Sequence, residues 1–110
     1  MKLIIIYIRQ EQLPAIKETL ADAGIFHFTV MPVLGTAPRS EQRTFRGIEQ
    51  KVTLFKRMRM ELIAKDAEVE NAITAISKGA MNSGGAGRIF ITEVFDAVKI
   101  WTGERGDQAI

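Results

Sequence analysis

A cluster of glycines followed by an arginine, Gly84 to Arg88, is the first feature of the sequence that could bind an anion. Closely spaced glycines let backbone N–H groups converge on a phosphate, and a guanidinium beside them adds charge-assisted donors. These glycines lie between a predicted helix and a predicted strand, whereas Walker loops and dinucleotide fingerprints run from strand to helix. The pattern therefore indicates another kind of phosphate loop, with a plain flexible connection as the alternative.

Basic side chains form a second candidate anion site, on and beside a long segment that has no apolar periodicity. Solvated charge on the wet face of a strand explains Lys56 and Arg59. Arg57 lies at the base of the segment, where it could contact a ligand or a neighbouring subunit. The full set is Arg39, Arg43, Arg46, Lys51, Lys56, Arg57 and Arg59.

The C-terminal segment offers a third candidate, because Lys99 precedes a glycine-rich polar tail that could place a cation near a phosphate. A frayed terminus explains the same residues equally well. His27 is the only histidine, so we expect a structural or surface role for it and no metal site. The sequence shows neither a Ser/His/Asp set nor paired catalytic carboxylates, which favours a binding protein over an enzyme.

The composition sets the class of protein that must carry these groups. The chain has 110 residues, of which 46% are hydrophobic and 25% charged, and it contains no cysteine. This predicts a single domain over residues 1–110, without disulfides, in the cytoplasm. Its apolar runs are far shorter than the roughly 20 residues of a membrane span. A net charge of +2 is too small to indicate nucleic-acid binding.

Apolar spacing predicts the first three elements. Leu3 to Ile8 is a β-branched and aromatic run, typical of a strand in mid-sheet that is buried on both faces. A helix is predicted over 13–23, ended by Gly24 in a left-handed conformation. Phe26 to Leu34 predicts a second strand, in which Pro32 indicates an edge, an end or a bulge.

The second half predicts a similar succession. Lys51 to Ala64 alternates like a long strand with one covered and one wet face. A second helix is predicted from Asp66, as its cap, to Gly79. Arg88 to Val94 and Ala97 to Thr102 are the last extended pieces.

This order predicts an α+β, ferredoxin-like βαββαβ sandwich with an antiparallel sheet and both helices on one face. A long loop joins strands two and three. It lacks apolar periodicity, and a loop of that length inside a small domain is usually functional or disordered. We therefore predict that residues 36–50 form a functional arm.

Taken in order, these features resemble the P-II family of signal-transduction proteins over nearly the whole chain. The glycine loop resembles that family's Gly-Asp-Gly-Lys-Ile-Phe segment, and part of the arm resembles its Arg-Gly-Ala-Glu segment. The resembling stretches are Met1 to Ile4, Leu13 to Gly24, Thr29 to Gly35, Arg46 to Glu49, Gly85 to Phe90 and Thr102 to Asp107.

The resemblance implies a regulatory homotrimer that binds an adenine nucleotide, ATP, ADP or AMP, in the clefts between neighbouring subunits. The family builds each cleft from three segments, which here are the base of the arm at 36–50, the glycine-rich loop at 80–87 and the C-terminal loop at 102–110. The resemblance, taken with the arginine at the base of the arm, predicts a nucleotide site of eight residues. They are Thr29, Gly35, Arg57, Ile63, Gly85, Gly87, Arg88 and Lys99.

The resemblance also implies a role for seven of these eight positions. Thr29 and Ile63 would line the adenine pocket, and Gly35 would lie near the nucleotide at the base of the arm. Gly85 and Gly87 would give backbone donors to phosphate. Two others are cations: Arg88 in place of the family's lysine, and Lys99 as one of two C-terminal basic residues. Arg57 is included because it lies at the base of the arm, where it could contact a ligand or a neighbouring subunit.

A target protein, such as a transporter, an enzyme or a carbon-fixation component, is implied as well, contacted through Arg39, Arg43 and Arg46 of the arm. Gln50 stands where many members carry a uridylylated tyrosine, so that modification is not expected. The hydroxyls of Ser40 and Thr44 leave phosphorylation open.

Other departures concern the effectors. The family's loop glutamine, which helps to hold magnesium and 2-oxoglutarate, has no clear counterpart here, and Trp101 replaces a basic residue. The resemblance is therefore to a P-II-like branch, some members of which serve carbon uptake or carboxysome operons and sense bicarbonate, AMP or ADP.

Two other functions remain open at this stage. One is a trimeric ferredoxin-like metal-binding or metal-tolerance protein without nucleotide sensing, because a fold does not fix a function. The other is an RNA-binding domain, which needs exposed aromatic rings on the sheet, and Tyr7 and Phe55 make a poor platform for bases.

Overall fold

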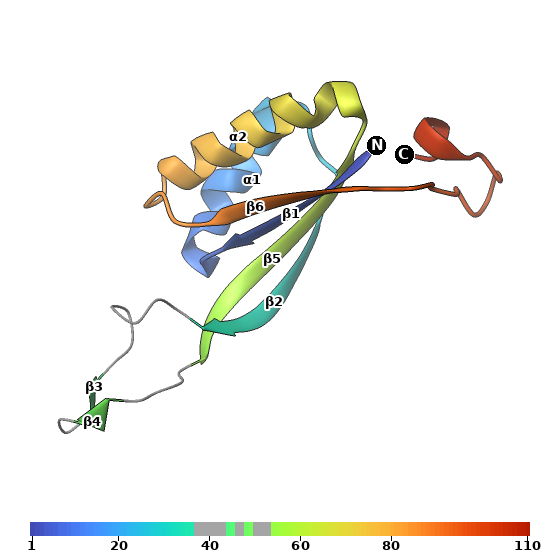
Figure 1. The fold of residues 1–110 in the computed structure, drawn as a ribbon. Helices are drawn as coiled ribbons and strands as arrows, with labels where there is room; N and C mark the ends of the chain where they lie inside the picture. Colours follow the sequence, from blue (N-terminus) through green and yellow to red (C-terminus); the bar gives the residue numbers. More distant parts are fainter. Residues whose placement is uncertain (37–43, 46–47, 50–53) are drawn as a thin grey trace.

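The computed structural model describes residues 1–36, 44–45, 48–49 and 54–110. An antiparallel four-stranded sheet carries two helices on one face (Figure 1). The strands, in their order across the sheet, are β2 (Thr29–Thr36), β5 (Leu54–Ala64), β1 (Lys2–Ile8) and β6 (Arg88–Glu93). The helices are α1 (Leu13–Asp22), after β1, and α2 (Val69–Met81), after β5. This arrangement is ferredoxin-like, so the predicted fold class is confirmed.

Shorter elements complete the described chain. Two-residue strands β3 (Thr44–Phe45) and β4 (Ile48–Glu49) pair antiparallel within the segment predicted to be the arm. The predicted partner-binding residues Arg39, Arg43 and Arg46 lie outside the described residues, as does Gln50. The 3-10 turns are η1 (Gln10–Gln12), η3 (Asp66–Glu68) and η4 (Gly106–Ala109).

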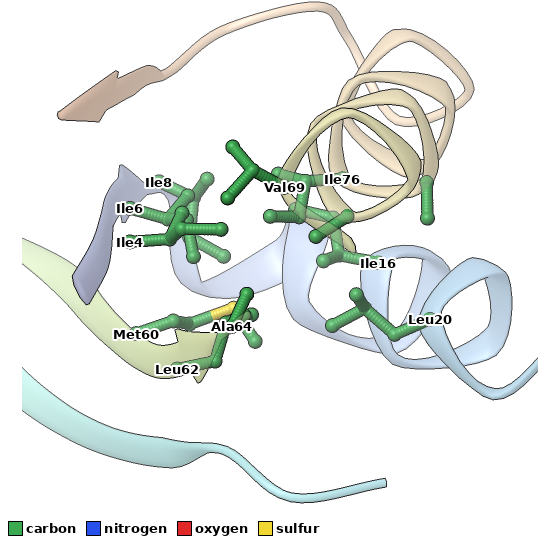
Figure 2. Close-up of a cluster of buried hydrophobic side chains, with 12 residues drawn as sticks. Ile4, Ile6, Ile8, Ile16, Leu20, Met60, Leu62, Ala64, Val69 and Ile76 are labelled. Carbon is green, nitrogen blue, oxygen red and sulfur yellow. The ribbon is translucent and has the colours of Figure 1, made fainter. Parts of the chain in front are cut away.

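The hydrophobic core lies between the helices and the covered face of the sheet (Figure 2). Alternate residues of β1, namely Ile4, Ile6 and Ile8, point at the helices because successive side chains of a strand point to opposite faces. Complete burial of such a side chain stabilises the fold by about 1.5–3 kcal/mol. Further core residues are Ile16, Leu20, Met60, Leu62, Ala64, Val69, Ala72, Ala75 and Ile76.

The two helices pack closely at Gly79. A Cβ atom at this position would lie 2.6 Å from the Cα atom of Ile16, so only glycine fits. The buried Thr19 hydroxyl donates a hydrogen bond of 2.7 Å to the Ala75 carbonyl across the same contact. The expectation that Gly79 ends α2 is therefore wrong: the helix continues to Met81, and Gly79 is a packing position inside it.

The second face of the sheet has no helix over it, which corrects the prediction that β1 is buried on both faces. Leu3 and Ile5 are half-buried, and Tyr7 is exposed. The expectation that β1 lies in mid-sheet is confirmed, and β2, which contains Pro32, is an edge strand as predicted. We call the uncovered side the open face.

The prediction that Asp66 caps the second helix is wrong. Its carboxylate accepts a hydrogen bond of 2.6 Å from the N-terminal amine, and Lys2 pairs with it as well. These hydrogen bonds, that of the N-terminal amine first, lower the pKa of Asp66 below its usual value. Asp66 thus ties the start of the chain to the start of η3.

The predicted strand over 97–102 is also wrong. Val98 forms an isolated bridge with Arg105, and the chain between them turns back on itself. The N–H groups of Thr102 and Gly103 both donate to the Lys99 carbonyl, and Gly103 has a φ of +77°, a conformation that favours glycine. We call residues 96–106 the C-terminal hairpin.

Candidate anion-binding site

The open face gathers most of the predicted site residues. In an antiparallel pair, residues opposite one another share a face of the sheet. Tyr7 lies opposite both Arg59 and Arg88, and Leu3 lies opposite Ile63, so all of these face away from the helices. The same alternation places Thr29, Gly35 and Arg57 there, since Thr29 pairs with Glu61 and Gly35 with Phe55.

At one end of the sheet lie Gly35, Arg57, Gly85, Gly87 and Arg88, which we call the loop-end group: Gly35 and Arg57 are on β2 and β5, and the glycine loop leads into β6 at the opposite edge. The Cγ atom of Arg57 lies 3.8 Å from the place where a Cβ of Gly35 would be, so the two residues adjoin. The Arg57 guanidinium lies 5.3 Å from the centre of the Phe55 ring and donates to the Lys56 carbonyl at 3.0 Å. These contacts fix the cation at the base of the arm.

The glycine-rich loop connects α2 to β6 in a fixed conformation. Gly84, Gly85 and Gly87 all have positive φ, and a Cβ at Gly87 would come within 2.9 Å of the Tyr7 carbonyl oxygen. The N–H of Gly85 donates to the Ala80 carbonyl at 2.7 Å, so the structure uses this N–H to close α2 rather than leaving it for a ligand. A cleft of about 250 Å³ beside Gly85, Gly87 and Arg88 is also lined by Ile6 and Ile76, so it lies between α2 and the sheet rather than on the open face.

Arg88 is the exposed cation of this loop. Its neighbour across the sheet, Tyr7, already accepts a hydrogen bond of 3.0 Å from Arg59, which also pairs with Glu61 at 2.8 Å. The structure gives the Arg88 guanidinium no ion pair or hydrogen bond within the described residues. Arg88 is therefore available to an anionic ligand, whereas Arg59 is committed.

At the other end of the sheet lie Thr29, Ile63 and Lys99, the tail-end group. All three line a cleft of about 970 Å³, together with Phe26 and Trp101. The Lys99 ammonium lies 5.6 Å from the centre of the Trp101 ring and 3.7 Å from a carboxylate oxygen of Glu104. The cleft thus combines apolar and aromatic walls with two lysines, Lys65 and Lys99, and with the carboxylates of Glu61 and Glu68.

The C-terminal hairpin that carries Lys99 is closed by an exposed ion pair. Asp96 accepts hydrogen bonds from the Arg105 guanidinium and, at 2.8 Å, from the N–H of Ala97. The Arg105 hydrogen bond, followed by that of Ala97, lowers the pKa of Asp96 below its usual value. Asp96 therefore remains an acceptor at neutral pH and holds the two sides of the hairpin together.

The two groups cannot meet on one chain. The glycine loop precedes β6 and the C-terminal hairpin follows it, and they lie at opposite ends of the strand (Figure 1). Six extended residues separate them by roughly 20 Å. In addition, the glycine loop and the C-terminal hairpin line different clefts.

Two further features near these groups were missed by the sequence analysis. Gln12 is fully buried and bonds to the glycine loop, and Asp96 and Arg105 close the C-terminal hairpin. Gln12 gives no sequence signal because its loop partner is 74 residues away. Asp96 and Arg105 are only nine residues apart, and a prediction of a hairpin over 96–106 would have found their ion pair.

Comparison with known proteins agrees with this arrangement. The family model described as "Nitrogen regulatory protein P-II" matches residues 1–104. The chain belongs to the P-II family. A Nitrogen regulatory protein P-II 1 from Methanothermobacter thermautotrophicus is 36% identical over 112 residues, which cover all of this chain and 97% of that protein.

Two further P-II relatives span the same length. A Nitrogen regulatory protein P-II from Rhodospirillum rubrum is 36% identical, with both chains covered completely. Nitrogen regulatory protein GlnK1 from Methanosarcina mazei is 32% identical over 114 residues, covering all of this chain and 97% of its own. The predicted family is confirmed, and the protein is a P-II family signalling protein with relatives named as nitrogen regulatory proteins.

Among the described residues, no three side chains of His, Asp or Glu lie together as metal ligands would. The described helices are also too short or too polar to cross a bilayer.

Proposed function

We propose that this P-II protein binds an adenine nucleotide, ADP, AMP or ATP, between neighbouring subunits of a homotrimer and controls a target protein through residues 36–50. The observation that carries the proposal is the division of the ligand groups between the two ends of one sheet. A ring in which each subunit contacts the next head to tail would bring the loop-end group of one subunit to the tail-end group of its neighbour.

Exposed apolar surface supports an assembly. The open face presents Phe90 and Ile63, and the C-terminal hairpin presents Ile100 and Trp101 at 92% and 82% exposure. Phe95, between β6 and the hairpin, is fully exposed. Apolar groups gathered in this way usually mark an interface, since their exposure to water is unfavourable.

The chemistry of the two groups fits the two parts of a nucleotide. Thr29 and Ile63 give the tail-end cleft a small polar group and an apolar wall for a base, while Arg57 and Arg88 give the loop end two cations for phosphates. Lys99 adds a third cation from the neighbouring subunit. Guanidinium groups suit phosphate because they donate through a planar fork.

The names of the relatives favour nitrogen metabolism as the process that is regulated. Trp101 and the arm sequence Thr36 to Ser40 favour a P-II-like role in carbon or bicarbonate metabolism instead. The target would then be a transporter, an enzyme or a carbon-fixation component, in the cytoplasm. Magnesium would be needed only if the bound nucleotide carries adjacent phosphates.

Isothermal titration calorimetry against ATP, ADP, AMP and cyclic AMP, with and without 2-oxoglutarate or bicarbonate, tests this function. Light scattering on the same samples gives the mass. We expect a trimer that binds at least one adenine nucleotide with no more than one molecule per subunit. A monomer at micromolar concentration, or a trimer that binds none of the four, would overturn the proposal.

A further inference from the structure

Gln12 is one of two buried polar side chains among the described residues, and it contacts the glycine loop. Its side-chain exposure is 0%, although its amide is strongly polar. Burying an amide is unfavourable unless its hydrogen bonds are replaced. Here Oε1 accepts from the Arg9 N–H at 2.8 Å, and Nε2 donates to the Ala86 carbonyl at 2.6 Å.

The second of these bonds joins the segment after β1 to a peptide between two flexible residues. Ala86 lies between Gly85, with a φ of 75°, and Gly87, with a φ of 130°. Glycines on both sides would let the intervening peptide groups rotate at little steric cost. The hydrogen bond from Gln12 selects the rotation in which the Ala86 carbonyl points into the protein.

That rotation decides where the next N–H points. The Ala86–Gly87 peptide is trans, and in a trans peptide the carbonyl and the N–H point in opposite directions. With the Ala86 carbonyl directed at Gln12, the Gly87 N–H is directed away from it. Gly87 itself runs close to β1, because a Cβ at this position would lie only 2.9 Å from the Tyr7 carbonyl oxygen.

We propose that Gln12 is a positioning residue, which aims the Gly87 N–H, directly before Arg88, at the phosphate of a bound nucleotide. The inference rests on the proposed nucleotide binding. The Gly85 N–H already donates to the Ala80 carbonyl, so of these two glycines Gly87 is the one whose N–H the loop can offer to a ligand. Gln12 acts only through the peptide and does not contact the ligand.

The test compares Gln12→Met with a matched control, Thr19→Val. Both substitutions remove a buried hydrogen bond to a backbone carbonyl, but Thr19 bonds to Ala75 between the helices and not to the loop. Gln12→Met should weaken ADP binding by about ten- to hundredfold, the value of one charge-assisted hydrogen bond. Thr19→Val should lower the melting temperature and leave the ADP dissociation constant unchanged.

Nuclear magnetic resonance supplies a measurement that should not change if Gln12 only stabilises the fold. In the wild-type protein the Gly87 amide resonance should shift on titration with ADP or inorganic pyrophosphate, and the shift should disappear in Gln12→Met. Gln12→Leu also removes the donor to Ala86 without burying a titratable group, and it gives the same comparison if Gln12→Met does not fold.

The outcomes separate this inference from the proposed function. If ADP shifts Thr29 and Ile63 but not Gly87, or if Gln12→Met binds ADP like the wild type, the function stands and the role of Gln12 is wrong. If ADP and the other adenine nucleotides shift no resonance of the wild-type protein, both are wrong.

Discussion

The two ends of the sheet hold their ligand groups by different physical means. At the loop end, Gly87 packs against β1 and the loop is tethered by the fully buried Gln12. At the tail end, Lys99 belongs to a hairpin that lies beyond the sheet and is closed by the exposed pair of Asp96 and Arg105 (Figure 1). Disturbance of the loop end should therefore reach the core, whereas the hairpin should open without unfolding the domain.

The largest predicted effect is a difference in stability between alanine substitutions at two glycines with positive φ, Gly87 at the loop end and Gly103 at the tail end. Gly87→Ala places a Cβ within 2.9 Å of a backbone oxygen of β1, while Gly103→Ala meets nothing within 4 Å. We expect Gly87→Ala to lower the free energy of unfolding by about 2–4 kcal/mol. Gly103→Ala carries only its backbone strain, about 1–2 kcal/mol within the hairpin.

Urea denaturation followed by circular dichroism measures this difference. The main transition should shift to lower urea for Gly87→Ala and remain near the wild-type midpoint for Gly103→Ala. Equal shifts would show that the hairpin and the sheet unfold as one unit, contrary to the comparison.

Arg88→Ala should weaken nucleotide binding by about ten- to hundredfold, because one charge-assisted contact to phosphate is lost. The melting temperature without ligand should stay unchanged, since the exposed guanidinium has no ion pair in the described chain. Arg59→Ala is the matched control on the same face: it loses its bonds to Tyr7 and Glu61 and should lower stability more than affinity. An Arg88→Ala titration that overlays the wild type would leave the loop without a phosphate role.

Acid should open the hairpin before it affects the sheet. The pKa of Asp96 is lowered in the folded protein, so its contribution to stability is present above the ordinary pKa of 3.8 and is lost as the pH falls below that value. Trp101, the only tryptophan, should report this opening through a change of fluorescence.

Asp96→Asn provides the comparison for that titration. It should show the changed fluorescence already at pH 7, with the circular dichroism of the sheet unaltered. A wild-type signal from Asp96→Asn at neutral pH would mean that the ion pair does not hold the hairpin closed.

Periodicity in the sequence was sufficient to predict the layers of the fold. The alternation in β5 and the spacing of Ile16 and Leu20 in α1 follow from burial on one face, which local sequence records. The strand predicted over 97–102 was wrong because Val98 and Ile100 alternate as a strand would, while Gly103 and the Asp96 pair fold the segment into a turn.

The candidate site could be predicted where glycine, arginine and lysine are residue types that favour anion binding, and not where a residue's position depends on distant contacts. Gly79 reads as a helix stop, although it is a close contact with α1 that depends on the packing of two helices. The bond from Gln12 to Ala86 spans 74 residues and is fixed only once β1 and β6 pair. The separation of the ligand groups between two ends of the sheet likewise follows from topology rather than from local pattern.

The central proposal is that each nucleotide is bound by the loop end of one subunit and the tail end of the next. Mixed trimers of Arg88→Ala and Lys99→Ala subunits test it directly. Each variant alone should bind ADP weakly, whereas calorimetry of trimers containing both should recover about one tight site per mixed trimer, where an intact Arg88 faces an intact Lys99. The contrary result is that the two variants assemble together and the wild type binds ADP, but mixing restores no tight site. The loop-end and tail-end groups would then not bind one nucleotide jointly across the interface.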